Sequence, residues 1–161
     1  MTETNTTANV VTLPSEREIL MTRVFNAPRE LVFRAHTDAE LIPQWWGLRD
    51  STTIVDKLDF QPDGAWRFIE RSADGAQIGF NGVFREVSPP ERLTYTFEYE
   101  GMPGHISVNT LSFDEQDGKT TLTSHIVFDS AEDRDGMLQS GMEWGANQSH
   151  EQLDELLETL L

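Results

Sequence analysis

Apolar and polar residues alternate through the middle of the chain, and this period of two constrains the fold more than any other feature of the sequence. Turn signals, such as Asp63 with Gly64 and Asp117 with Gly118, divide this part of the chain into short pieces. The pieces predict six strands, at residues 50–60, 64–71, 77–87, 92–100, 106–113 and 119–128. Because each strand comes after the previous one by way of a short turn, we expect an antiparallel meander.

The predicted sheet has one apolar face that is rich in aromatic side chains. In the strand at 92–100, Leu93, Tyr95 and Phe97 alternate with threonine and glutamate. Trp66 and Phe68 share one face of their own strand in the same way. This pattern is typical of an antiparallel sheet with one packed face and one solvated face, so another element must cover the aromatic side.

The residues before the meander predict one more strand and two short helices. Residues 16–25 are rich in β-branched and apolar residues and predict the strand. Asn26 can cap a first helix that runs to about His36, and Thr37 with Glu40 has the capping-box spacing that starts a second. Gly47 is placed to end that second helix. We expect residues 1–14 to be a flexible tail and residues 15–161 to form a single domain.

A long amphipathic helix near the C-terminus is the expected cover for the sheet. Ser130 can cap a helix that runs to about Leu160, and a helix of even about 25 residues is roughly 38 Å long, enough to lie across the sheet. Its apolar stripe contains Leu138, Met142, Gly145, Ala146, Ser149, Leu153, Leu156, Leu157 and Leu160. The predicted fold class is therefore α+β, with a curved antiparallel sheet of about seven strands around a long C-terminal helix.

The stripe of this helix is uneven in side-chain size. Its C-terminal half is leucine, whereas its N-terminal half contains glycine, alanine and serine. Small residues opposite an aromatic sheet indicate either close backbone contact or a hollow for a small apolar ligand. In the second case the expected ligand-binding residues are Trp45 and Trp46 at the mouth and, in the walls, Trp66, Phe68, Phe80, Phe84, Tyr95, Phe97, Met142, Gly145, Ala146 and Ser149.

Net charge and one tryptophan indicate a second kind of function. The chain has 28 acidic and 12 basic residues and a net charge of −16, which opposes binding to nucleic acid and to anionic membranes. This charge either serves solubility or forms an acidic docking surface for a basic partner. Trp144 lies opposite the leucine stripe, so it is either an interface with a protein partner or a second copy, or it is covered by a loop or the tail.

Motifs for catalysis, metals and cofactors are scarce. The absence of cysteine excludes disulfides, thiolate metal sites and cysteine nucleophiles. No phosphate-binding loop or nucleophile elbow occurs, and the four histidines lack the spacing of metal ligands, so we expect no cofactor and no metal. An enzyme of the cyclase or hydrolase type stays open as a third class. There is no signal peptide and no run of about 18 apolar residues, so the cytoplasm is the default location.

Five stretches of the sequence resemble proteins similar to the activator of the heat-shock ATPase, a family within the START-like or SRPBCC superfamily. Residues 19–47 contain a strand, an Ala-Pro helix start, a Thr-Asp helix start and a Trp-Trp-Gly end. Residues 59–68, 82–97, 118–122 and 141–157 come next, in the order and spacing of the family. The resemblance covers most of the chain.

The resemblance implies a helix-grip fold, in which a curved antiparallel sheet wraps around the C-terminal helix, often with a cavity between them. Relatives in the superfamily bind lipids, hormones or polyketides, and some are cyclases or hydroxylase subunits, so the fold alone selects no function. The resemblance extends only to the C-terminal domain of the eukaryotic co-chaperone and not to the domain that grips the chaperone. The leading hypothesis is therefore the binding of a small hydrophobic or amphipathic molecule. The alternative is a protein-interaction module that acts through Trp144 and the acidic surface.

Overall fold

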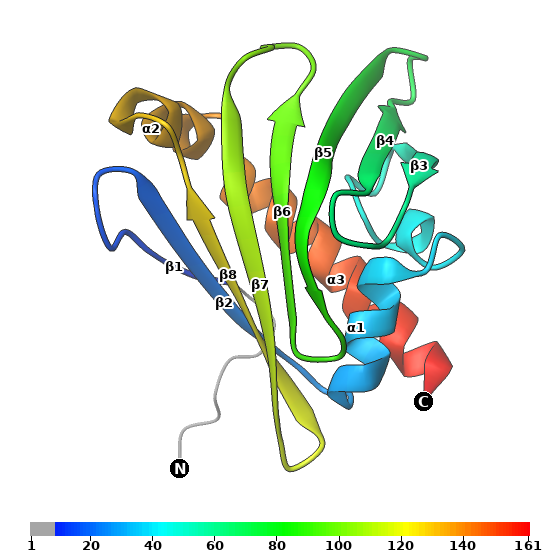
Figure 1. The fold of residues 1–161 in the computed structure, drawn as a ribbon. Coiled ribbons are helices and arrows are strands. Elements are labelled where there is room, and N and C mark those ends of the chain that lie inside the picture. The colour runs from blue at the N-terminus through cyan, green and yellow to red at the C-terminus, as the bar shows by residue number, and fades with distance from the viewer. Residues whose placement is uncertain (1–8) are drawn as a thin grey trace.

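One antiparallel sheet of eight strands is the main layer of the structure, a computed structural model that describes residues 9–161 (Figure 1). The strands lie in the order β1-β2-β8-β7-β6-β5-β4-β3, so β3 to β8 form the expected meander and β8 lies beside β2. Each meander strand is where the sequence predicts it to within three residues. The strands are β1 (Val10–Thr12), β2 (Glu18–Phe25), β3 (Thr52–Leu58), β4 (Ala65–Arg71), β5 (Gln77–Ser88), β6 (Arg92–Tyr99), β7 (Ile106–Gln116) and β8 (Lys119–Val127).

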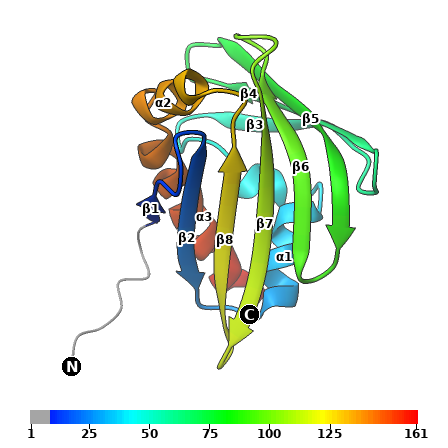
Figure 2. The ribbon, with the colours of Figure 1, turned by 60° about the vertical axis from the view of Figure 1, so that its left-hand side comes forward.

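Three α-helices and one 3-10 turn complete the described part of the chain. They are α1 (Arg29–Thr37), η1 (Ile42–Gln44), α2 (Ala131–Gln139) and α3 (Met142–Leu160). The sheet curves around α3, with α1 beside the C-terminal half of that helix and α2 near the opposite end of the sheet (Figures 1 and 2). The predicted α+β architecture is confirmed, with one strand more than the seven or so expected.

The eighth strand corrects the expectation for the N-terminus. β1 lies inside the segment expected to be a flexible tail, yet it pairs with β2, with Val10 opposite Thr22 and Thr12 opposite Leu20. Without β1, β2 would be an edge strand with unpaired main-chain groups, and this pairing gives those groups partners. The rest of the expected tail, residues 1–8, lies outside the described residues.

The prediction of one continuous C-terminal helix is wrong, because the helix is broken in two. α2 ends at Gln139 and α3 begins at Met142, and Gly141 between them has a φ of +85°, in the left-handed region that glycine adopts at little cost. Ser130 caps α2 as expected, since its hydroxyl accepts a hydrogen bond from the Asp133 N–H at 3.0 Å. The break leaves α2 without a fully buried residue, and only α3 packs deeply on the sheet.

The two short helices also begin differently from the prediction. α1 starts after Pro28 rather than after a side-chain cap at Asn26. The Thr37 hydroxyl donates back to the Phe33 carbonyl at 3.1 Å, so it does not cap a second helix. The Asp38 carboxylate accepts from the Glu40 N–H at 2.8 Å in the turn before the next element, which has no side-chain cap. The next element is the single turn η1 rather than a full helix.

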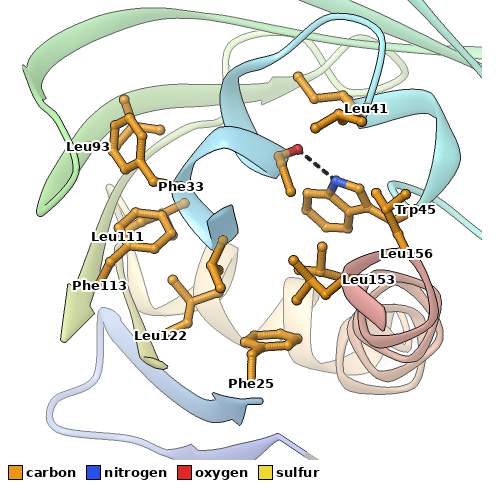
Figure 3. Close-up of a cluster of buried hydrophobic side chains, with 14 of the residues drawn as sticks. Phe25, Phe33, Leu41, Trp45, Leu93, Leu111, Phe113, Leu122, Leu153 and Leu156 are labelled. Carbon is orange, nitrogen blue, oxygen red and sulfur yellow. Dashed lines mark hydrogen bonds between the residues drawn. The ribbon is translucent and has the colours of Figure 1, made fainter. Parts of the chain in front are cut away.

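The leucine half of α3 forms the centre of the hydrophobic core. Leu153, Leu156 and Leu157 are all buried. Figure 3 shows Leu153 and Leu156 near Trp45 and Phe25, with the side chains of β6, β7 and β8 beyond them. The Trp45 indole N–H donates to the Ala35 carbonyl at 2.8 Å, which ties the segment after η1 to α1 (Figure 3).

One buried ion pair joins β2 to α3. Arg23 is almost fully buried, and its Nη2 donates to Oδ2 of Asp154 at 2.6 Å. Its Nη1 donates to the His150 carbonyl at 3.2 Å, and its guanidinium lies 4.6 Å from the centre of the Phe25 ring. A buried charge needs such partners, because losing one of them leaves an uncompensated ion inside the protein.

The core position of Leu153 generates a stability prediction. Leu153→Ala should lower the free energy of unfolding by about 2–5 kcal/mol, because it leaves a cavity in the centre of the core. Leu161→Ala is the matched control, since that leucine is 69% exposed and its truncation should change the value by less than about 0.5 kcal/mol. Urea denaturation monitored by circular dichroism measures both. Equal losses in the two variants would contradict this description of the core.

Candidate functional site

A cavity of about 360 Å³ lies between the N-terminal half of α3 and the inner face of the sheet. Its wall comes from β2 to β8, from α1 and η1, and from both helices at the C-terminal end of the chain. Most of the lining is aromatic or aliphatic. The size is at the small end of the range for ligand pockets, which corresponds to a molecule of one or two rings.

All of the residues that the sequence predicts for the ligand site lie in this wall. They are Trp45, Trp46, Trp66, Phe68, Phe80, Phe84, Tyr95, Phe97, Met142, Gly145, Ala146 and Ser149. Gly145 of α3 faces open space rather than a neighbouring backbone. At Gly145, an added methyl group would touch only the Leu48 side chain, at 3.8 Å. That these residues bind a ligand stays a prediction.

Aromatic side chains on three neighbouring strands form the far wall. Trp66 of β4 lies 4.9 Å from Phe68, 5.7 Å from Tyr95 and 5.9 Å from Phe97, between ring centres. Its indole N–H donates to the Thr96 carbonyl of β6 at 3.2 Å, across β5. This reach requires a glycine at position 82, because a side chain there would collide with both the indole nitrogen and that carbonyl.

The loop after η1 is fastened to α3 by hydrogen bonds. The Gly47 N–H donates to the Ser149 hydroxyl at 3.0 Å, and that hydroxyl donates to the Gly47 carbonyl at 2.9 Å. Gln152 donates to the same carbonyl at 2.9 Å. These bonds hold the neighbouring Trp46 against Phe68 and Phe80. The Ser149 hydroxyl is thus engaged in positioning the loop, although the residue lines the cavity.

Two histidines in the wall are absent from the site predicted from the sequence, in which the inward positions are nearly all apolar. His36 of α1 and His150 of α3 both line the cavity, and both rings are close to Trp45. The spacing does carry a signal, since His150 follows Ala146 by four residues and precedes Leu153 by three. That signal is weak, because histidine is found both inside and outside proteins and does not by itself extend an apolar stripe.

Burial keeps both histidines neutral. It lowers the pKa of His36 to about 4, against a smaller opposite effect of the hydrogen bond to the Val32 carbonyl. It lowers the pKa of His150 to about 3, with further lowering by the positive charges of His36 and Arg23. An imidazole without a nearby anion is more easily buried in its uncharged form.

The sheet side of the cavity also carries polar side chains. Ser107 and Asn109 of β7 and Ser124 of β8 are buried in the wall. Burial raises the pKa of Tyr95, with a hydrogen bond to Asn109 acting in the opposite direction. No group of three or more side chains suited to hold a metal ion occurs within residues 9–161.

Trp144 lies outside the cavity, near the start of α3. It is 62% exposed, so no loop of the described chain covers it. Of the two alternatives for this residue, cover by a loop within residues 9–161 is therefore wrong. Cover by residues 1–8 concerns a segment outside the described residues.

An antiparallel sheet that curves around a C-terminal helix, with a cavity between the two, defines a helix-grip protein. Residues 26–158 match the family described as activator of Hsp90 ATPase homolog 1-like protein, and the chain belongs to this family. The resemblance seen in the sequence is therefore confirmed. No protein with curated annotation matches the sequence.

Solved structures of bacterial proteins share the fold. A protein from Rhodobacter sphaeroides is 23% identical, with a TM-score of 0.88 over 94% of this chain and 99% of its own. A protein from Staphylococcus epidermidis is 28% identical, with a TM-score of 0.79 over 92% and 94%. The AHSA1 protein from Silicibacter pomeroyi is 21% identical, with a TM-score of 0.74 over 89% and 99%.

None of the helices in residues 9–161 combines the length and the apolar character that crossing a membrane requires.

The buried histidines generate a prediction on pH. An unfolded histidine takes up a proton below about pH 6.5, whereas folded His36 and His150 do so only near 4 and 3. The unfolded state therefore binds more protons as the pH falls, and each histidine should lower the free energy of unfolding by about 2 kcal/mol between pH 8 and pH 5. Urea denaturation at several pH values measures this loss.

His36→Gln and His150→Gln test the assignment. Each variant should lose its own share of the pH dependence, and the double variant should be flatter between pH 8 and pH 5 than either single one. A double variant with the wild-type slope would show that other groups cause the dependence.

Proposed function

We propose that this protein binds a small apolar or amphipathic molecule in the cavity between α3 and the sheet. The observation that supports the proposal best is the cavity itself, with about 360 Å³ of space and a largely aromatic wall. Ligand sites in proteins share these properties, namely a concave apolar surface with a few polar groups that orient the ligand. Membership of the family fits a binding role but names no ligand.

The size difference between the two halves of α3 supports this proposal. Three buried leucines in the C-terminal half fill the space to the sheet and set the position of the helix. In the N-terminal half, Gly145 and Ala146 have side chains too short to reach the aromatic wall. A rigid helix cannot bend to close such a gap, so the space stays open to a ligand.

Two methionines form the part of the wall that adapts most easily. Met137 of α2 and Met142 of α3 line the cavity on either side of the break at Gly141. Methionine is unbranched and flexible, and it is often found where a surface must fit differently shaped molecules. The cavity therefore combines a rigid aromatic wall with an edge of two flexible methionine side chains.

Filling the gap tests the proposal. Ala146→Leu should weaken ligand binding by about tenfold or more while the protein stays folded, because the added side chain occupies the cavity. Ala65→Leu is the matched control, since Ala65 is exposed on β4 and should bind as the wild type does. Native mass spectrometry of the purified protein, with denaturing extraction afterwards, identifies a bound molecule. Normal binding by Ala146→Leu would place the site elsewhere.

A second candidate function is association with another protein through Trp144. This residue is 62% exposed, and large exposed aromatic side chains are enriched at interfaces. The net charge of −16 makes copies of the chain repel one another, so an apolar contact is best measured where salt screens that charge.

The association candidate is tested by sedimentation velocity in moderate salt. The wild type should form a dimer that Trp144→Ala dissociates, because truncation removes a large exposed aromatic side chain from α3. Leu161→Ala is the control, since Leu161 is also exposed but lies at the far end of α3, and its truncation should leave the dimer intact. A wild type that stays monomeric at high concentration would contradict self-association.

A further inference from the structure

Two imidazole nitrogens in the cavity wall are hydrogen-bond acceptors without a donor. His36 uses Nδ1 to bond the Val32 carbonyl of its own helix at 2.8 Å. A carbonyl oxygen only accepts, so Nδ1 must carry the proton. Nε2 of the neutral ring is then left with a lone pair, and no residue within 9–161 donates to it.

The same argument fixes the tautomer of His150. Its Nδ1 lies 2.9 Å from Oδ1 of Asn9. The Asn9 amide is oriented by Asn147, whose Oδ1 accepts from both the side-chain and main-chain N–H groups of Asn9, at 3.1 and 2.9 Å. Oδ1 of Asn9 therefore faces His150 as an acceptor, and His150 Nδ1 is the donor. Its Nε2 is again an acceptor with no donor among the described residues.

Trp45 cannot supply the missing donor. Its ring is close to both imidazoles, with its centre 4.7 Å from that of His36 and 6.2 Å from that of His150. Its single N–H group already donates to the Ala35 carbonyl. Because His150 is only 8% exposed and both rings line the cavity, a molecule in the cavity is the partner best placed to donate.

The charges around the cavity determine which kind of ligand group can donate to these nitrogens. Both imidazoles are neutral at ordinary pH, so an anion would place its negative oxygens against their lone pairs. The wall also contains Glu70, and the whole chain has a net charge of −16. A carboxylate or phosphate is therefore disfavoured, whereas an uncharged hydroxyl group donates one hydrogen bond at no electrostatic cost.

We infer that the ligand is an uncharged molecule with an apolar body of one or two rings and a hydroxyl group, which donates a hydrogen bond to Nε2 of His36 or His150. This inference rests on the proposed binding function and names the class of ligand. The aromatic wall takes the rings, and the buried side chains of Ser107, Asn109 and Ser124 offer further polar contacts on the sheet side.

Three probes of similar size test the inference. 2-Naphthol has a hydroxyl donor, 2-methoxynaphthalene has the same rings without a donor, and 2-naphthoate is an anion. Fluorescence titration should show that 2-naphthol binds about tenfold more tightly than 2-methoxynaphthalene, which is the effect of one hydrogen bond. 2-Naphthoate should bind most weakly. Equal affinities of the first two probes for the wild type would overturn the inference and leave the cavity function standing.

Two variants locate the acceptor. His36→Phe and His150→Phe keep a ring beside Trp45 but remove the lone pair. At least one of them, folded as judged by circular dichroism, should reduce the preference for 2-naphthol to about threefold or less and keep the wild-type affinity for 2-methoxynaphthalene. A full preference in both variants would overturn the assignment. If Ala146→Leu weakens the binding of none of the three probes, the cavity function itself fails, and the inference with it.

Discussion

The contact between the leucine half of α3 and the sheet is the constraint on which the rest of the structure depends. Leu153, Leu156 and Leu157 pack against Phe25, Trp45 and the strands behind them, and so set the distance of the helix from the sheet. At the other end of α3, Gly145 and Ala146 line the cavity with side chains much shorter than leucine. One half of the helix supplies stability, and the other half leaves the space in which a ligand can bind.

The sheet and the apolar wall could be predicted because both result from local alternation. Trp66, Phe68, Tyr95 and Phe97 lie on the inner face, as the period of two requires. Ile78 shares the parity of Phe80 and Phe84 but is 41% exposed, so parity alone does not decide burial along β5. The break at Gly141 could not be inferred from spacing, since a glycine inside an apolar stripe is equally compatible with a continuous helix. β1 could not be predicted either, because three residues carry too little pattern to indicate a strand.

The polar part of the site escaped prediction for a different reason. The orientation of each imidazole depends on its hydrogen-bond partner. For His36 the partner is on its own helix, and for His150 it is Asn9, 141 residues away. No spacing rule links Asn9 to His150, and tertiary structure alone brings them together. The same holds for Arg23, a charge on the otherwise apolar inward face of β2, whose burial is explained only by its ion pair with Asp154. Buried polar residues of this kind are specified by their partners rather than by their neighbours in the chain.

The contrast between Arg23 and the two histidines shows how the site differs from the core around it. Arg23 lies beside His150 and is matched by a carboxylate, so that its charge is compensated within the fold. His36 and His150 have only half of their hydrogen-bonding capacity satisfied by the described chain, although burial makes an unpaired acceptor unfavourable. Arg23 Nε is also buried without a partner among the described residues, but Arg23 does not line the cavity, whereas both imidazoles do. The unpaired imidazole nitrogens are therefore better explained by a molecule that enters the cavity than by imperfect packing, and this argues for function at the place where the small residues of α3 leave room for it.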